Sequence, residues 1–399
     1  EASSAARTGD ARPVAAASGP ASGAENELQS LEDALVDAGF EEVRVGRDGE
    51  LLVVEYENNR FNHAESDGLA VVRSEVAAAG LGDAPVAVVL KRSGIRMVEV
   101  VLAPGAHAAE RWTWHPRARD AAWVSASPRN RVALHSALVL APGLRTFVAW
   151  DRSILDYALS FRPDLIVQLW PGATAFGRAD VQLLRSDDLG DGRLLNRYRH
   201  DPRLEFATVH QAVPLARGLM AMIGGGLYRA SEAGVVAEAL WLSGDGTHAF
   251  GVQGTRTWDD ERVGRYAATV SWRGRYAPLD LVATVRAGQF HAGDRGASIE
   301  LSRWFGATEL GFYYADTDVR LAGAFISLPL TPRRDMRPGW LQVRGARRWD
   351  HEIASVVGGT RNPLTTGVAE PPLAPWNLES SYRDSGRLSA DGLLGSADR

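Results

Sequence analysis

Residues 265–273 have the sequence Arg-Tyr-Ala-Ala-Thr-Val-Ser-Trp-Arg, and their pattern indicates the fold class. Apolar and polar side chains alternate along it, with Ala267 the one apolar residue at a polar position. The apolar set is Tyr266, Ala268, Val270 and Trp272. The polar set is Arg265, Thr269, Ser271 and Arg273. Because successive side chains of a β-strand point to opposite faces, the pattern predicts a strand with one apolar and one polar face.

The two following segments, residues 279–286 and 297–302, show the same alternation. Their apolar sets are Leu279, Leu281, Ala283 and Val285, and then Ala297, Ile299 and Leu301. Outward from there, Gly/Asp/Pro/Arg turns separate strands of about 8 to 13 residues, and we count about 14 strands from Arg131 to Trp349. The expected strands before the turns become regular are 132–140, 144–155 and 165–170.

This pattern predicts a closed antiparallel sheet that crosses a membrane. In such a sheet every strand alternates between a lipid face and a polar lumen. We therefore expect a mainly β chain in which residues 131–361 form an outer-membrane β-barrel of about 14 to 16 strands. A barrel of this size leaves a lumen that side chains alone do not fill.

Six tryptophans near the ends of predicted strands fit the aromatic girdles that lie at the two membrane interfaces. They are Trp150, Trp170, Trp241, Trp272, Trp304 and Trp349. The alternative is that they fill the core of a soluble, strand-rich protein, which also needs large side chains.

The N-terminal part of the chain has a different pattern. Leu28, Leu31 and Leu35 recur at helical spacing before Gly39, and strand-like segments then flank the turn Asp48-Gly49. A second helix is expected to begin at Asn62 as its cap, with Glu65 three residues later, and a second hairpin follows over 86–102. These elements predict a small α+β domain. If the following region is an outer-membrane barrel, we expect this domain to lie in the periplasm.

We expect five regions along the chain. They are a flexible lead at 1–25, the α+β domain at 26–105, a connector at 106–130, the barrel at 131–361 and an extended tail or plug at 362–399. The last region has four prolines and a polar end, and Trp376 is among its few apolar groups.

Composition and motifs exclude several function classes. The net charge of −5 and the absence of a basic stripe argue against a nucleic-acid partner, and no cysteine is present for disulfides or thiolate metal sites. No apolar run approaches the ~18 residues that a membrane-spanning helix needs. The usual motifs of hydrolases, nucleotide-binding proteins and zinc enzymes are missing, and the nine histidines lack metal-ligand spacing. We therefore expect no enzyme, no catalytic residue, no metal and no cofactor.

Charged and amide residues at polar positions of the predicted strands are candidate pore-lining residues. They are Glu238, Gln253, Arg265, Arg273, Asp280, Arg286, Glu300, Glu309, Gln342 and Arg344. Such a mixed lining suits a hydrated, often anionic polymer, because arginines offer forked donors and carboxylates accept from sugar hydroxyls. A general porin would have a similar lining.

The loop Asn58-Asn59-Arg60-Phe61 between a strand and a helix of the small domain is a candidate partner-binding loop. Asparagines in this position also serve turns and helix caps. Both interpretations remain open at this stage.

Two regions resemble the YjbH family, also called GfcD-like, of outer-membrane proteins encoded with exopolysaccharide and capsule secretion systems. One is the small-domain sequence of residues 39–45 and 52–62, and the other is Gly-Gln-Phe-His-Ala-Gly-Asp-Arg-Gly-Ala at 288–297 with Leu-Ser-Arg-Trp-Phe-Gly at 301–306. The resemblance implies an outer-membrane barrel that helps a periplasmic Wza-like export protein to pass polysaccharide, with outer-membrane lipid around it. It implies no catalytic residue.

Two further functions stay open. In the first, the barrel is plugged and the protein serves as a scaffold or binding protein for the export complex. In the second, the protein is a glycan-modifying enzyme. The second alternative would use paired carboxylates, of which Glu238, Asp280, Glu300 and Glu309 are the candidates.

Overall fold

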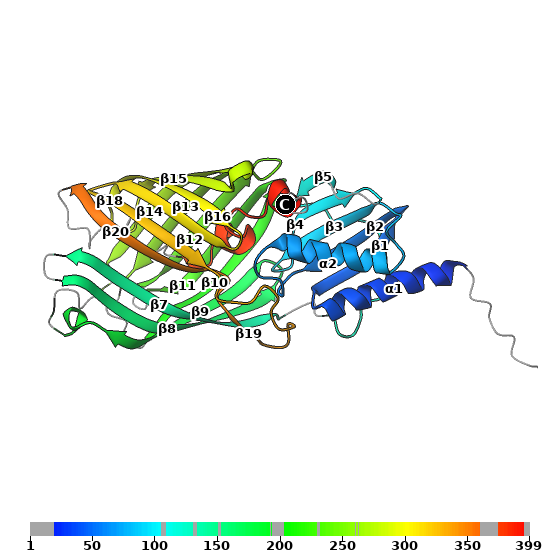
Figure 1. Cartoon of the computed structure of the whole chain (residues 1–399), viewed down its shortest axis with the longest axis horizontal. Coiled ribbons are helices and arrows are strands. Elements are labelled where there is room, and N and C mark those ends of the chain that lie inside the picture. The colour runs from blue at the N-terminus through cyan, green and yellow to red at the C-terminus, as the bar shows by residue number, and fades with distance from the viewer. Residues whose placement is uncertain are drawn as a thin grey trace, which may run out of the picture.

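The computed structural model is mainly β and contains two sheets, one of six strands near the N-terminus and one of fourteen strands. Figure 1 shows the two sheets end to end, with the C-terminus between them. No helix in the described part of the chain is long and apolar enough to cross a membrane. The described residues are 20–104, 109–130, 134–150, 153–191, 193, 203–229, 232–259, 261, 263–359 and 374–394.

The six-stranded sheet forms the small domain and has the strand order β5-β4-β3-β2-β1-β6. Two antiparallel hairpins, β1–β2 and β3–β4, are joined through α2, so that β2 and β3 run parallel. The elements are α1 (Pro20–Ala38), β1 (Glu41–Asp48), β2 (Leu51–Glu57), α2 (Glu65–Ala78), β3 (Val86–Arg92), β4 (Ile95–Leu102), β5 (Ala109–Trp114) and β6 (Ala122–Trp123). The helix–hairpin–helix–hairpin order is the one that the sequence predicts.

The apolar stripe of α1 is fully buried, and Leu31 and Leu35 pack with residues of α2 and of one sheet face. Three details differ from the sequence-based expectations. The helix begins at Pro20 instead of near residue 26, and the expected connector supplies both edge strands of the sheet, β5 and β6. Asn62 does not cap α2, because Ala64 occupies the cap position without a side-chain hydrogen bond.

The fourteen-stranded sheet is antiparallel except where β19 pairs in parallel with β7. From β7 to β18, each strand pairs with the next one in sequence. The strands are β7 (Ser136–Trp150), β8 (Ser153–Trp170), β9 (Ala173–Arg185), β10 (Arg203–Ala216), β11 (Leu219–Tyr228), β12 (Glu232–Leu242), β13 (His248–Trp258), β14 (Gly264–Tyr276), β15 (Leu281–Gln289), β16 (Arg295–Phe305), β17 (Thr308–Asp316), β18 (Val319–Leu328), β19 (Gln342–Gly345) and β20 (Trp349–Gly359).

The large sheet curls so that its first and last long strands approach each other (Figure 1). The Trp349 Nε1 atom of β20 donates to the Pro142 carbonyl of β7 at 2.7 Å, and Thr146 and His351 form a second contact at 3.3 Å. The backbone pairings of the described residues do not join β7 to β20. The structure is thus a curled sheet with two neighbouring edges, and a closed barrel is not found in it.

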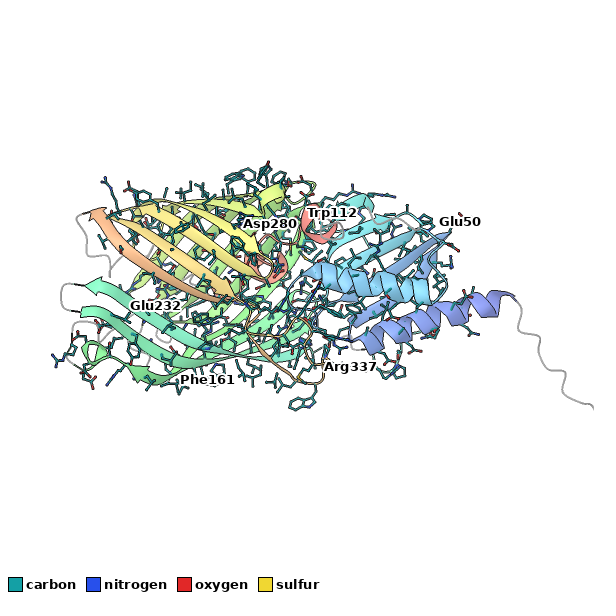
Figure 2. The ribbon with its side chains drawn as sticks, in the orientation of Figure 1. Glu50, Trp112, Phe161, Glu232, Asp280 and Arg337 are labelled. Atoms are coloured by element: carbon teal, nitrogen blue, oxygen red, sulfur yellow. The ribbon has the colours of Figure 1, made fainter. Side chains whose placement is uncertain are left out.

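The two faces of the large sheet have opposite polarity, and the outer face is the apolar one. Phe312 of β17 is 70% exposed and Ile223 of β11 is 60% exposed, while Phe161 of β8 projects away from the interior (Figure 2). The alternation predicted for β14 is present, since Tyr266 and Val270 are exposed on this face. Charged residues and their partners lie on the inner face, which the next subsection describes.

Candidate functional site

The inner face of the large sheet holds a segment from the C-terminal end of the chain, residues 374–394, at the end near the small domain. We call residues 374–394 the C-terminal segment. It contains the π-helical turn η5 (Leu378–Tyr382) and the short helix α3 (Ala390–Leu394). Leu378, Tyr382 and Leu388 join the hydrophobic cluster that the small domain shares with β11, β12 and β13. The small domain and the C-terminal segment together cover this end of the inner face (Figure 1).

Polar contacts fix the C-terminal segment to predicted pore-lining residues. The Leu378 backbone N–H donates to Glu238 at 2.9 Å, and the other oxygen of Glu238 accepts from Gln253 at 2.6 Å. Arg273 of β14 forms an ion pair of 2.5 Å with Glu379. Glu238, Gln253 and Arg273 therefore lie on the inner face, and two of them hold the segment.

Arg383 is the most buried charged side chain of the segment, with 1% exposure. Its Nη2 atom donates to the Gly246 carbonyl at 2.7 Å, and its Nη1 atom lies 3.4 Å from Glu379. Burial alone would raise the pKa of Glu379, but the charges of Arg383 and Arg273 outweigh it and lower that pKa. Glu379 thus stays ionised between two arginines.

Other predicted pore-lining residues are already paired within the wall. Arg265 forms an ion pair of 3.2 Å with Glu232, and Glu309 forms one of 2.5 Å with Arg348. Arg286 and Glu300, on β15 and β16, share the inner face with Arg273 through the register of the sheet. Arg286 remains exposed there. Because solvent reaches Arg286, other side chains do not cover the inner face around this residue.

Asp280, Gln342 and Arg344 lie at the end near the small domain. Asp280 is not in a strand, because it follows the short helix η3 (Ala277–Leu279) with a φ of 49° and pairs with Arg275 at 2.8 Å. Gln342 donates to the carbonyl of Asn59 in the small domain at 2.8 Å. Arg344 lies on the same short strand, β19. All ten predicted residues thus occupy the inner face or its domain end.

Four of the predicted interface tryptophans lie near strand ends on the domain side of the outer wall. They are Trp170, Trp241, Trp272 and Trp349, of which Trp170 and Trp241 are exposed. Trp304 differs from the prediction, because it is 6% exposed and lies under the guanidinium groups of Arg348 and Arg387. Its neighbours Arg303 and Phe305 are the residues that face outward. The side chain of Trp150 lies outside the described part.

The predicted partner-binding loop, Asn58 to Phe61, is buried against the chain itself. The Asn58 Oδ1 atom accepts the backbone N–H groups of Arg60 and Phe61, which is the turn chemistry that was the alternative interpretation. Arg60 donates to the Asp335 carbonyl at 3.1 Å. The structure therefore places this loop at the junction with residues 331–342 instead of on a free surface.

The junction has a second contact, between the turn of β3–β4 and the turn of β8–β9. The Gly172 N–H donates to the Ser93 carbonyl at 2.7 Å. A Cβ atom on Gly94, whose φ is 73°, would lie 3.0 Å from the Pro171 Cα atom. The positive φ and the close approach of the two turns both favour glycine at this position.

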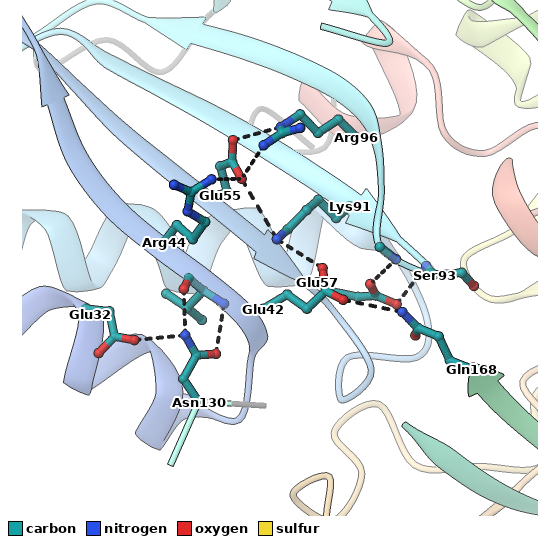
Figure 3. Close-up of polar contacts among 12 residues, drawn as sticks. Glu32, Glu42, Arg44, Glu55, Glu57, Lys91, Ser93, Arg96, Asn130 and Gln168 are labelled. Carbon is teal, nitrogen blue, oxygen red and sulfur yellow. Dashed lines mark hydrogen bonds and ion pairs between the residues drawn. The ribbon is translucent and has the colours of Figure 1, made fainter. Parts of the chain in front are cut away.

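A charged network on the small-domain sheet leads to the same junction (Figure 3). Glu55 is 1% exposed and lies within ion-pair distance of Arg44, Lys91 and Arg96. Lys91 also pairs with Glu42 at 3.1 Å. Burial and the nearby Glu57 raise the pKa of Glu42. The Gln168 side chain of β8 reaches Glu42 at 3.4 Å, so the network touches the large sheet.

Sequence reasoning missed two ion pairs of the inner face. Asp164 and Arg178 are paired at 2.6 Å between β8 and β9, and Glu232 pairs with His291 at 2.7 Å. Asp164 lies in β8 just before the strand expected at 165–170, and His291 lies in the turn between β15 and β16. The alternation of polar and apolar residues could have placed Arg178 on the inner face, since Arg178 and Asp180 alternate with small or apolar neighbours.

Within the described residues, no group of three or more His, Asp or Glu side chains is placed to hold a metal ion. Glu238, Asp280 and Glu309 each have a hydrogen-bond or ion-pair partner. The charged and amide side chains of the inner face suit the binding of polar or charged groups.

The sequence profile described as "Exopolysaccharide biosynthesis protein YbjH", of the YjbH family, matches residues 3–324. The match includes the small domain and the strands up to β18. No curated protein matches the chain.

Proposed function

We propose that this chain, which belongs to the YjbH family and so has an exopolysaccharide-related function, is an outer-membrane β-barrel component of an exopolysaccharide or capsule export machinery. In this proposal the large sheet closes around a lumen in the outer membrane. The small domain stands in the periplasm and docks a Wza-like export protein. The protein acts without catalysis and passes or guides polysaccharide.

One observation carries the proposal, namely the reversed polarity of the large sheet. In a water-soluble protein the inner face is apolar, whereas here the exposed outer face carries large apolar side chains and the inner face carries ion pairs. A wall of this kind is stable when lipid surrounds it. The short distance between β7 and β20 leaves only a small movement to complete a ring.

The exposed tryptophans support the same placement. Trp170 and Trp241 lie near the domain ends of their strands, and their amphipathic rings suit a membrane interface. This interface would be the periplasmic one, because the small domain adjoins it.

A second function is favoured by the C-terminal segment, namely a plugged barrel that acts as a scaffold of the export complex. The segment is held by Glu238, Arg273 and Gly246 and covers the domain end of the inner face. A lumen covered in this way does not conduct unless the segment moves.

The test compares cells that produce the full chain with cells that lack it. It measures the membrane fraction that contains the protein and the amounts of polymer inside and outside the cell. We expect the protein in the outer-membrane fraction, with heat-modifiable migration, and polymer retained in the periplasm when it is deleted. A water-soluble monomer would refute the barrel, and unchanged export on deletion would refute the export role.

Removal of residues 374–394 distinguishes the two functions. An increase in single-channel conductance of the truncated protein in planar bilayers favours a passage with a removable plug. A conductance that remains closed favours the scaffold.

A further inference from the structure

Three arginines come together where the small domain, β19 and the C-terminal segment meet. They are Arg92, Arg344 and Arg347. The charge of Arg92 acts on both of the others, and the charge of Arg344 acts on Arg347. Gln342 is buried and Val343 is exposed on the opposite side of β19, so the alternation of the strand puts Arg344 on the inner side.

The three guanidinium groups differ in how well they are paired. Arg92 has a partner at each terminal nitrogen, with an ion pair of 2.6 Å from Nη2 to Glu65 and a hydrogen bond of 3.2 Å from Nη1 to the Asn58 carbonyl. Arg347 donates from Nε to Asn62 at 3.1 Å. The Nε and Nη1 atoms of Arg344 and the Nη2 atom of Arg347 are buried, and none of them has a hydrogen-bond partner among the described residues.

Buried donors without partners lower the stability of a folded protein, and the effect is larger when they carry charge. Burial, together with the charges of Arg344 and Arg92, lowers the pKa of Arg347 well below its ordinary value. An apolar side chain would avoid this cost. The arrangement is therefore expected to have a ligand that completes these donors.

The acidic side chains whose charges act on Arg344 and Arg347 do not complete them. For Arg344 they are Asp335, which accepts from Asn62, Thr331 and the Met336 N–H, and Glu41, which accepts from Asn59. For Arg347 they are Glu65 and Asp384. Glu65 is engaged by Arg92 and Asn58. Asp384 of the C-terminal segment interacts electrostatically with Arg347, but it forms no ion pair among the described residues. Asp384 thus offsets charge and leaves the donors of Arg344 and Arg347 open.

We propose that Arg344 and Arg347 form a binding site for a carboxylate, and that the carboxylate belongs to an acidic sugar of the polysaccharide. The choice of a sugar rests on the proposed function, whereas the carboxylate site rests on the open donors alone. Forked N–H groups match a carboxylate in a bidentate manner, which an ammonium group does not reproduce. Phosphate has related oxyanion chemistry, so the experiment must separate the two.

The test is calorimetric titration of the purified full chain in detergent with an oligomer of galacturonic acid. A maltooligosaccharide of equal length is the neutral comparison, and inorganic phosphate is the second oxyanion. We expect the acidic oligomer to bind and the neutral one not to bind. Arg344→Gln or Arg347→Gln should weaken binding by about tenfold or more, because a hydrogen bond to a charged group is lost.

Two further variants keep the test independent of folding. Arg344→Lys keeps the charge without the fork, so its affinity should lie between those of the wild type and Arg344→Gln. Arg344→Met should lose binding and melt at a higher temperature than the wild type, because open donors are removed. Arg303→Gln, on the exposed outer face, should leave the affinity unchanged.

Equal affinity of the wild type and both glutamine variants would overturn the site. Phosphate binding without binding of the acidic oligomer would overturn the sugar assignment. A chain that reaches the outer membrane and supports export without binding the oligomer would refute this inference alone. A chain that binds the oligomer but stays soluble would refute the proposed function alone.

Discussion

In the small-domain sheet, the apolar side chains of β2 and β3 are buried on both faces, whereas in the large sheet those of β16 and β17 are exposed along the outer face. Leucine and valine occur in the strands of both sheets. The small domain therefore excludes water by its own packing of helices and strands. The large sheet needs an apolar environment outside the chain, and it places its charges inside.

The largest expected effect concerns the ion pair between Arg92 and Glu65, which is buried at the junction. Arg92→Met leaves the carboxyl of Glu65 buried beside Asn58 without its cation. We expect a loss of about 3–5 kcal/mol in the free energy of unfolding, measured by denaturant titration of the small-domain transition.

Arg303→Met on the outer face is the matched control. Arg303 is exposed and lies over the Phe305 ring at 5.0 Å, so its removal leaves no charge without a partner in the interior. If Arg303→Met lowered the stability as much as Arg92→Met, the two arginines would have similar environments, against our expectation.

The next effect compares two leucines. Leu35 of α1 is fully buried, and Leu35→Ala should cost about 2–5 kcal/mol in the free energy of unfolding, because it leaves a cavity in the core. Leu301 of β16 is exposed, and Leu301→Ala should change stability in detergent by no more than about 0.5 kcal/mol. Similar losses at both positions would mean that the outer face is packed against protein.

The sequence predicts some regions of the fold better than others. The small domain and strands β14 to β16 are predicted well, because helical spacing and strict alternation are local signals. The strand expected at 144–155 is wrong, because β7 ends at Trp150 and β8 begins at Ser153. The strand expected at 165–170 is present, but only as the last part of the longer β8. β7 and β8 run through Pro142 and Pro163, and Pro142 lies at the edge that faces β20.

The candidate site was less predictable than the fold. The alternation of side chains along a strand identified inner-face residues such as Glu238 and Arg273, because this alternation is a local property of each strand. The sequence does not reveal their partners, because Leu378 and Glu379 lie more than a hundred positions away along the chain. Asn62 shows the same limit, since its side chain donates to Asp335 across the junction instead of capping α2.

A third prediction tests the outer face directly. Val270→Arg places a charge on the exposed side of β14, and it should reduce folding into lipid vesicles by about 2–4 kcal/mol if this face contacts the bilayer interior. Thr269→Arg, one residue earlier and on the inner face, should be tolerated. Equal tolerance of the two arginines, measured by urea titration in vesicles, would place water on both faces.

The smallest effect concerns pH and the C-terminal segment, and it has opposite signs in the two regions. The pKa of Glu65 in the small domain is raised, chiefly by burial, so the stability associated with that group decreases as the pH rises through its folded-state value. The pKa of Glu379 is lowered from 4.5, since the charges of Arg383 and Arg273 outweigh burial. A carboxyl of this kind stabilises the folded state above its unfolded pKa and loses that contribution as the pH falls through the lowered value.

We therefore expect protection of residues 374–394 from hydrogen exchange to be constant from neutral pH to about 4.5 and to decrease below it, where Glu379 takes up a proton. Glu379→Gln should remove this pH dependence and weaken docking at neutral pH by about 1.5–3 kcal/mol, because hydrogen bonds to a charged group are replaced by neutral ones. Glu261→Gln, in a turn at the far end of the sheet, is the matched control and should behave as the wild type. If protection of the segment in the wild type is the same at acidic and neutral pH, the contact between Glu379 and Arg273 does not hold it. Its other contacts, which are the packing of Leu378, Tyr382 and Leu388 and the hydrogen bond from Arg383 to the Gly246 carbonyl, then keep it on the inner face.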